Sequence, residues 1–220
     1  ICQSAYMQED LVRNYEVTAN TTMVIHNAVE AFADQINQPK IRQEEINYKF
    51  ITVARLSEEK GIERLIHAVG LLSISFKYYI IGEGNKRGEL QKLIDDLQLQ
   101  DKVFLTGQKN DPFNAMGDAD LFLMGSYYEG FPNVLLEAGA HGIPVVAFNV
   151  PGGIAEIIAD NETGLLVNDA DPIAFATTIN KAITTGFNRK KIIESTRKRF
   201  SVNTMIQSLE NIFLEPAPNK

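Results

Sequence analysis

Apolar residues in the middle of the chain follow two alternating patterns. Five short runs are almost continuously apolar, at residues 50–54, 78–81, 103–105, 120–124 and 144–148. Runs of this length without a regular polar face are typical of strands that are buried on both sides of a sheet. The pattern therefore predicts five inner strands.

Segments with helical spacing separate these runs. Apolar residues recur three and four positions apart within residues 62–69 and again within residues 90–97, as they do on one face of a helix. Helix-forming stretches at residues 111–117 and 132–141 complete the alternation. Repeated strand-then-helix units predict an α/β fold, with a parallel sheet covered by helices on both faces.

The two ends of the chain depart from this alternation. Residues 1–15 predict a short helix and residues 22–26 a strand, after which residues 27–47 are polar and irregular. Beyond residue 167 the pattern is mainly helical, and residues 216–220 should fray.

These patterns divide the chain into three parts. We expect an interdomain connector and N-terminal extension at residues 1–47, a sheet-containing domain at residues 48–214 and a frayed tail at residues 215–220. The chain begins at Ile1 rather than Met, and its first residues resemble the middle of a longer sequence. We therefore expect a fragment of a longer protein.

Charge and composition exclude several classes of protein. The 220 residues carry a net charge of -7, which argues against a general nucleic-acid binder because such a protein needs a basic surface. Cys2 is the single cysteine, so the chain can form no internal disulfide and has no Cys-x-x-Cys motif. No apolar run is long enough to span a bilayer. We expect a cytoplasmic protein.

A basic cluster near the C-terminal end stands out from this acidic background. It consists of Arg189, Lys190, Lys191, Arg197, Lys198 and Arg199. Such a cluster is usually a solvated helix face. The alternative is peripheral contact with the anionic inner face of the plasma membrane.

The segment from Glu129 to Glu137 carries the clearest chemistry. Pro132 suits the first turn of a helix, and Gly130 before it allows a ligand to approach the backbone closely. N–H groups of Gly130, Phe131, Asn133 and Val134 would then point outward at a helix start, which is an anion site.

Glu129 and Glu137 flank this helix start. If a diphosphate lies there, one carboxylate could reach the hydroxyls of a sugar and the other those of a ribose. The simpler alternative, in which Glu129 caps a helix and Glu137 is a surface acid, stays open from spacing alone.

Three further loops follow predicted strands, at the edge where parallel sheets bind ligands. Arg55 and Lys60 could clamp a diphosphate, or belong to a solvated turn with neighbouring glutamates. Gly82 and Gly84 begin a glycine pattern that resembles a dinucleotide fingerprint, but its third glycine falls at 88 instead of 87, which weakens a dehydrogenase interpretation. Gln108 lies in a loop that could offer backbone groups to a base.

Together these motifs resemble the C-terminal domain of family 4 (group 1) retaining glycosyltransferases, which have the GT-B fold. The resemblance covers roughly residues 1–214. It rests on the ordered segments at residues 55–61, 82–84, 107, 128–138, 142–146, 152–156 and 164–167, among which the Glu-x7-Glu element at Glu129 and Glu137 is the most specific.

The resemblance implies a Rossmann-like domain that forms one half of a GT-B fold and binds a nucleotide-sugar donor. Arg55 and Lys60 would neutralise the diphosphate, and Glu129 would bind the transferred sugar without acting as a nucleophile. Glu137 would bind the ribose, and the segment near Gln108 would contact the base. The backbone from Gly130 to Val134, including Pro132, would hold sugar and phosphate, while Gly82 and Gly84 would line the site.

The same resemblance implies a partner domain and an enzyme class. It implies transfer of a hexosyl unit, from a UDP-sugar by base rate, to a glycan or lipid-linked acceptor in bacterial polysaccharide assembly, without a metal or other cofactor. By this resemblance we expect the N-terminal domain that holds the acceptor to be missing and this chain alone to be inactive. A standalone sugar-nucleotide-binding module and a GT-B phosphorylase or epimerase stay open as alternatives.

Overall fold

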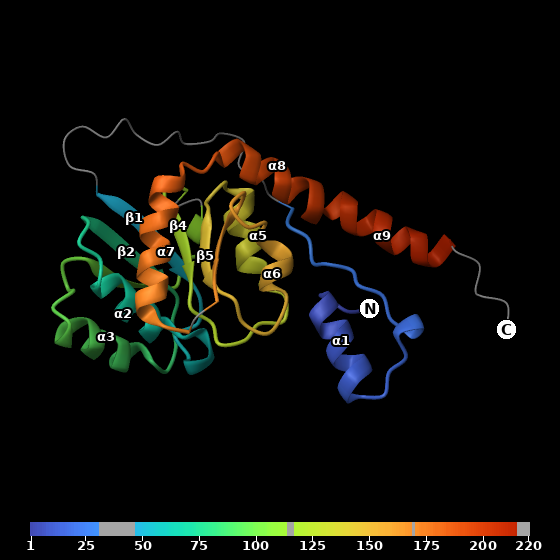
Figure 1. Cartoon of the computed structure of the whole chain (residues 1–220), viewed down its shortest axis with the longest axis horizontal. Coiled ribbons are helices and arrows are strands. Elements are labelled where there is room, and N and C mark those ends of the chain that lie inside the picture. Colours follow the sequence, from blue (N-terminus) through green and yellow to red (C-terminus); the bar gives the residue numbers. More distant parts are fainter. Residues whose placement is uncertain (31–46, 114–116, 169, 215–220) are drawn as a thin grey trace.

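Six parallel strands form the sheet at the centre of the molecule (Figure 1). The computed structural model describes residues 1–30, 47–113, 117–168 and 170–214. The strand order is β3-β2-β1-β4-β5-β6. The strands are β1 (Tyr48–Val53), β2 (Phe76–Ile81), β3 (Val103–Gly107), β4 (Leu121–Met124), β5 (Val145–Phe148) and β6 (Gly164–Val167).

Helices cover both faces of this sheet, as the sequence predicts. One face packs against α2 (Ile62–Gly70), α3 (Arg87–Asp96) and α7 (Pro172–Thr185). The other packs against α5 (Asn133–Ala140), α6 (Ile154–Ile157) and α8 (Arg189–Phe200). Helix α9 (Val202–Leu214) continues from α8 and buries no residue.

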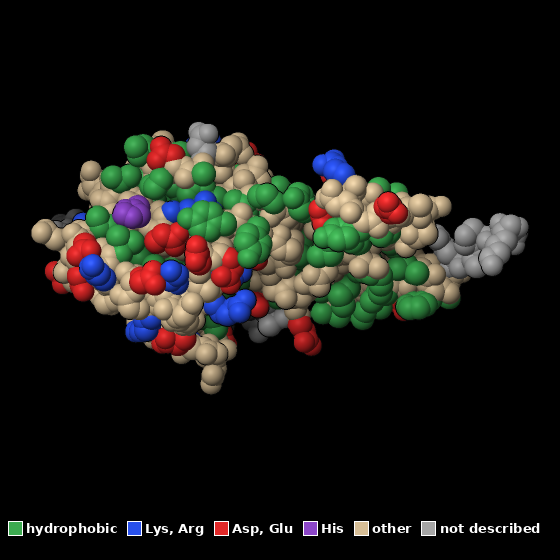
Figure 2. Space-filling view, turned by 90° about the horizontal axis from the view of Figure 1, so that it is seen from below, with side chains coloured by type: hydrophobic (Ala, Val, Ile, Leu, Met, Phe, Trp, Pro, Cys, Tyr) green, Lys and Arg blue, Asp and Glu red, His purple; other side chains and the backbone are tan. Residues whose placement is uncertain are grey.

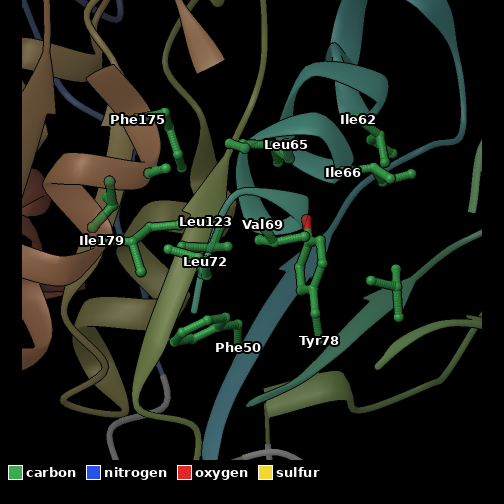
Figure 3. Packing of buried hydrophobic residues seen from close by; sticks show 14 of the residues in the cluster. Phe50, Ile62, Leu65, Ile66, Val69, Leu72, Tyr78, Leu123, Phe175 and Ile179 are labelled. Atoms are coloured by element: carbon green, nitrogen blue, oxygen red, sulfur yellow. The ribbon is translucent and has the colours of Figure 1, made fainter. Parts of the chain in front are cut away.

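Successive side chains of each strand supply the two cores in turn. In β4, Leu121 and Leu123 belong to the core under α2 and α7, whereas Phe122 and Met124 belong to the core under α5. Figure 3 shows the first core, in which Leu123 lies near Phe175 and Ile179 of α7. Because a strand with two buried faces has no polar side, this packing explains the continuous apolar runs.

The strand order locates the ligand crevice of the sheet. The chain passes outward from β1 to β3 and then returns to place β4 beside the opposite edge of β1. The loops that leave β1 and β4 therefore turn toward opposite faces and leave a crevice between them. In doubly wound sheets of this order, ligands bind in that crevice at the carboxyl ends of the strands.

The N-terminal segment lies beside the sheet domain, next to the ends of α8 and α9 (Figure 1). It contains α1 (Ala5–Asn14) and η1 (Ala19–Thr21). The helix predicted at residues 1–15 is present, but the strand predicted at residues 22–26 is wrong. Val24 forms only an isolated parallel bridge with Cys2, because no longer strand lies beside it in the described part of the chain.

Other differences from the predicted elements are local. The structure contains one further strand, β6, which the sequence pattern did not predict. With four residues it is short, and it lies next to the helical C-terminal region. The helix predicted at residues 111–117 includes residues 114–116, and the irregular segment at 27–47 includes residues 31–46; these lie outside the described residues, as does the tail at 215–220. Among the described helices, none has the length and apolar character needed to cross a membrane.

Candidate functional site

Two loops meet back to back at the crevice between β1 and β4. Gly61 follows β1 with φ of 54°, and a Cβ atom added to it would lie 2.1 Å from the carbonyl oxygen of Gly125, which follows β4. A Cβ on Gly125 would in turn lie 2.4 Å from the carbonyl oxygen of Gly61. Only glycine fits at either position. The close approach of the two loops brings neighbouring residues of one loop within hydrogen-bonding distance of residues of the other.

Arg64, a buried residue of α2, fixes the loop after β4. Its guanidinium donates hydrogen bonds to the carbonyl oxygens of Gly125, at 2.5 Å, and Ser126. The same group lies over the rings of Phe148 and Tyr127, 3.8 Å and 4.2 Å from their centroids. Burial lowers the pKa of Arg64, but an arginine stays charged at neutral pH.

Lys60 and Glu129 form an ion pair across the crevice. The Lys60 Nζ atom donates to Glu129 Oε1 at 2.7 Å, and Ser126 Oγ donates to the same oxygen at 2.6 Å. The side chains are 21% and 11% exposed, so solvent screens the pair only in part. The structure thus brings together two of the three residues predicted to be catalytic.

A cavity of about 310 Å³ opens beside this pair. Its lining includes the ends of β1 and β4, the Lys60–Glu129 pair and the start of α5 at Phe131, Pro132, Asn133 and Val134. Because the first N–H groups of a helix have no partner within the helix, the start of α5 presents donors and a positive dipole end to the cavity. The cavity is therefore suited to a ligand with an anionic group.

Tyr127 and Tyr128 line a second, larger open groove of about 860 Å³. Its rim carries the carboxylates of Glu58, Glu59, Glu63 and Glu89, with Lys86 as a basic member. Figure 2 shows acidic side chains, interspersed with Lys and Arg, on the face of the sheet domain seen from below. Carboxylates repel phosphate, so size alone misidentifies the anion site and charge favours the smaller cavity.

The third residue predicted to be catalytic, Arg55, does not line the cavity in this structure. Its side chain is 79% exposed and lies 3.7 Å from Glu59 Oε1, within the solvated turn that the sequence left as an alternative. A hydrogen bond from Ser57 lowers the pKa of Glu59, with a smaller contribution from the Arg55 charge. Arg55 lies two residues after the end of β1.

Gly82, Gly84 and Gln108 also lie outside the cavity lining. A Cβ on Gly82 would lie 1.9 Å from the carbonyl oxygen of Ala54, and one on Gly84 would lie 2.3 Å from that of Leu56. Both glycines therefore allow the loop after β2 to pass the loop after β1. Gln108 is exposed just beyond the end of β3.

Glu137 lies on α5, one turn beyond the cavity lining. Burial raises the pKa of its carboxyl, and the charge of His141 partly offsets that effect. A half-buried carboxylate with a raised pKa is a costly group for a helix surface, which counts against the interpretation as an ordinary surface acid.

Arg64 and Ser126 contribute to the site without having been predicted from the sequence. Arg64 was hidden within a helix whose apolar spacing gives an arginine no special meaning, and Ser126 precedes the conspicuous segment by three residues. Among the described residues, no group of three or more His, Cys, Asp or Glu side chains could hold a metal ion.

Comparison with known proteins identifies the family of this chain. The model for glycosyl transferases group 1 matches residues 34–199. The N-acetylgalactosamine-N,N'-diacetylbacillosaminyl-diphospho-undecaprenol 4-alpha-N-acetylgalactosaminyltransferase of Campylobacter jejuni is 36% identical over 160 residues, which are 72% of this chain and 43% of that protein. The lipopolysaccharide core biosynthesis glycosyltransferase LpsE of Rhizobium meliloti is 32% identical over 144 residues, which are 66% of this chain and 42% of that protein.

Solved glycosyltransferase structures share the fold. The structure of Anabaena Alr3699/HepE in complex with UDP matches with a TM-score of 0.83 and 25% identity, over 96% of this chain and 62% of that one. The lipopolysaccharide outer core galactosyltransferase WaaB matches with a TM-score of 0.86 and 22% identity, over 96% of this chain and 60% of that one.

The matches cover most of this chain but only part of its relatives. The chain spans less than half the length of the two curated relatives and about 60% of the two solved chains. The six-stranded parallel sheet agrees with the predicted Rossmann-like α/β fold and with the GT-B glycosyltransferases. Since the family model covers most of the sequence, the chain belongs to the group 1 glycosyltransferases.

Proposed function

We propose that this chain is the nucleotide-sugar-binding domain of a retaining glycosyltransferase that transfers a hexosyl unit from a UDP-sugar. The observation that carries the proposal is the Lys60–Glu129 pair, 2.7 Å long, beside the start of α5. A cation, a carboxylate and a helix N-terminus thus face one cavity, which matches the charges and hydroxyls of a nucleoside diphosphate sugar.

Each side of the cavity suits a different part of the donor. The diphosphate would lie against the start of α5 and take the Lys60 ammonium from Glu129, with Arg55 swinging in as a second cation. The Glu129 carboxylate, released from Lys60, would accept hydrogen bonds from hydroxyls of the transferred sugar. Glu137, further along α5, would accept them from the ribose, and the loop at Gln108 would face the base.

The reaction proceeds by exchange at the anomeric carbon. The bond between that carbon and the diphosphate oxygen breaks, and the acceptor hydroxyl oxygen bonds to the same face of the carbon. The hydroxyl proton passes to the leaving phosphate, so the products are a glycoside and UDP. Lys60 and the helix dipole stabilise the charge that grows on the diphosphate, which is electrostatic catalysis without an enzyme nucleophile or a metal ion.

We propose that the acceptor, a glycan or a lipid-linked glycan, is bound by a further domain, since the chain spans about 60% of the length of the two solved chains it matches. Alone, the chain would bind the donor weakly and transfer little. Support for UDP comes from the structures of HepE in complex with UDP, with UDP and glucose, and with UDP-glucose.

A cytoplasmic location with membrane contact fits a lipid-linked acceptor. Arg189 and Arg199 of α8 donate to backbone carbonyls and belong to the fold, but Lys190, Lys191 and Lys198 are exposed. We propose that this exposed basic face of α8 contacts anionic lipids at the inner face of the plasma membrane.

Calorimetric titration of the chain with UDP, GDP and ADP tests the donor site. We expect binding of UDP in preference to the other two, unchanged when EDTA is present. Lys60→Met should weaken that binding, whereas Lys181→Met, an exposed lysine on α7 outside the cavity, serves as the matched control. Absence of heat with all three nucleotides, in protein shown to be folded by circular dichroism, would refute the proposal.

A further inference from the structure

The N-terminal segment, which the sequence presents as a mere extension, contacts the loop that forms the start of the candidate site. The ring of His26 stacks on that of Phe131, with centroids 4.9 Å apart and planes 10° from parallel. The Asn27 side chain donates to Asn133 Oδ1 at 2.7 Å. A Cβ on Gly130 would lie 3.9 Å from the Met7 side chain of α1.

Glu156 holds this segment in place from the opposite side. One of its carboxylate oxygens accepts from the backbone N–H of Ala5 at 2.9 Å and lies 3.0 Å from His26 Nε2. The other oxygen accepts from the N–H of Tyr6 at 3.2 Å. A carboxylate at the start of a helix is stabilised by the helix dipole, so Glu156 caps α1 from another part of the chain.

The pKa of Glu156 agrees with this arrangement. Burial of the carboxyl acts to raise its pKa, but the hydrogen bonds from Ala5, His26 and Tyr6 outweigh burial, and the pKa is lowered. The charged form therefore prefers this setting. Glu156 faces α1 and His26 and does not line the 310 Å³ cavity, so its link to the site runs through His26.

Besides the bonds of Lys60 and Ser126 to the Glu129 side chain, two backbone hydrogen bonds hold the loop between Glu129 and Asn133. Glu129 N donates to the carbonyl oxygen of Pro151 at 3.1 Å, and Gly153 N donates to that of Gly130 at 2.7 Å. Both bonds come from the loop after β5. The ring of Phe131 packs against Gly153 of that loop, since an added Cβ on Gly153 would lie 2.6 Å from it. The same ring also contacts His26 by stacking and Phe200, 5.8 Å away, by an edge contact.

We infer that His26 and Asn27 are positioning residues for the donor site, with Glu156 fixing the orientation of His26. The inference rests on the proposed function, because the loop they hold is the one whose backbone would bind phosphate and sugar. His26 fixes the loop through the Phe131 ring, and Asn27 fixes the first residue of α5. Neither needs to touch the donor, since a loop held in its binding conformation loses less entropy when the ligand arrives.

His26→Ala and His26→Phe, with His67→Ala as a matched control on the exposed face of α2, test the stacking contact. UDP affinity is measured by calorimetry, and amide hydrogen exchange of residues 130–134 is followed in the ligand-free protein. An aromatic stack is worth enough to expect about twofold to tenfold weaker UDP binding in His26→Ala. His26→Phe keeps the stack and should restore most of the affinity, while His67→Ala should change nothing.

Hydrogen exchange separates this inference from the proposed function. Faster exchange at residues 130–134 in His26→Ala, with slow exchange regained in His26→Phe, supports positioning even if no nucleotide binds to the wild-type chain. Unchanged exchange in a folded His26→Ala variant would overturn it, whatever the nucleotide result. Glu156→Gln and Asn27→Ala should each speed exchange at the same residues; a loss of stability in urea without faster local exchange would reduce both residues to structural roles.

Discussion

Competition for the Lys60 ammonium gives a prediction in which two neighbouring substitutions act in opposite directions. In the structure Lys60 is paired with Glu129, and a bound diphosphate would compete with that carboxylate for the ammonium. Lys60→Met removes the cation and should weaken UDP binding. Glu129→Gln removes the competitor and a negative charge near the phosphate, and should strengthen it.

The structure sets the size of both effects. A hydrogen bond to a charged group contributes about 1.5–3 kcal/mol, and a partly exposed ion pair such as Lys60–Glu129 about 1 kcal/mol. Since UDP gains the first and gives up the second, Lys60→Met should weaken binding by about 0.5–2 kcal/mol, or about 2- to 30-fold. Glu129→Gln should tighten binding by up to about fivefold.

Calorimetry on the two single variants and the double variant measures these changes in the free energy of UDP binding. In the Lys60→Met background, the gain from Glu129→Gln should shrink, because only repulsion between the carboxylate and the diphosphate remains to be relieved. Urea unfolding shows that each variant is folded. Weaker UDP binding in Glu129→Gln, equal to that of Lys60→Met, would refute the competition, and an unchanged affinity in both would place the phosphate elsewhere.

Three further predictions concern other parts of the chain. Glu137→Gln should raise the free energy of unfolding near pH 7 and weaken UDP binding. Burial raises the pKa of the Glu137 carboxyl above 4.5, so the stabilising contribution of this group is present below pH 4.5 and is lost as pH rises through the folded pKa. The stability that Glu137→Gln gains near pH 7 should therefore vanish at about pH 4. Gly125→Ala should lower the free energy of unfolding in urea by about 1–3 kcal/mol through overlap with Gly61, whereas Gly88→Ala, a helical glycine whose added Cβ meets nothing within 4 Å, should raise it by about 0.5–1 kcal/mol. Replacing Lys190 and Lys191 by Glu should reduce flotation of the chain with phosphatidylserine vesicles, an effect that salt should mimic.

Each of these predictions has a result that contradicts it. A Glu137→Gln variant whose stability gain is the same at both pH values would show that burial of the charge is not the cause. Equal effects of the two glycine substitutions would remove the argument from close approach of the loops. Vesicle binding that is absent in the wild-type chain, or unaffected by the charge reversal, would reject membrane contact through α8.

Five strands of the sheet could be predicted from the sequence because they are buried on both faces. The five predicted strands are present because a strand between two layers of helices shows an apolar residue at every position, as residues 121–124 do. The strand β6 was missed because four residues next to a helical region carry too short a signal. Residues 22–26 have strand composition, but a strand needs a neighbour, and Cys2 offers a single bridge.

The candidate site divides in the same way between local pattern and tertiary contact. The position of Glu129, Pro132 and Glu137 around a helix start after a strand can be predicted from the sequence, because that information is local and periodic. The contact between Lys60 and Glu129 could not be predicted, since it depends on β4 returning beside β1 and on two glycines that let their loops touch.

Long-range packing also decided the roles of residues that the sequence undervalued. Arg64 holds the loop after β4 from within a helix, and His26 reaches Phe131 across more than a hundred residues of chain. Arg55, which belongs to the same motif as Lys60, is instead largely exposed and lies beside Glu59. A sequence records which groups are available to a site, whereas contact between groups distant in the chain depends on how the elements pack.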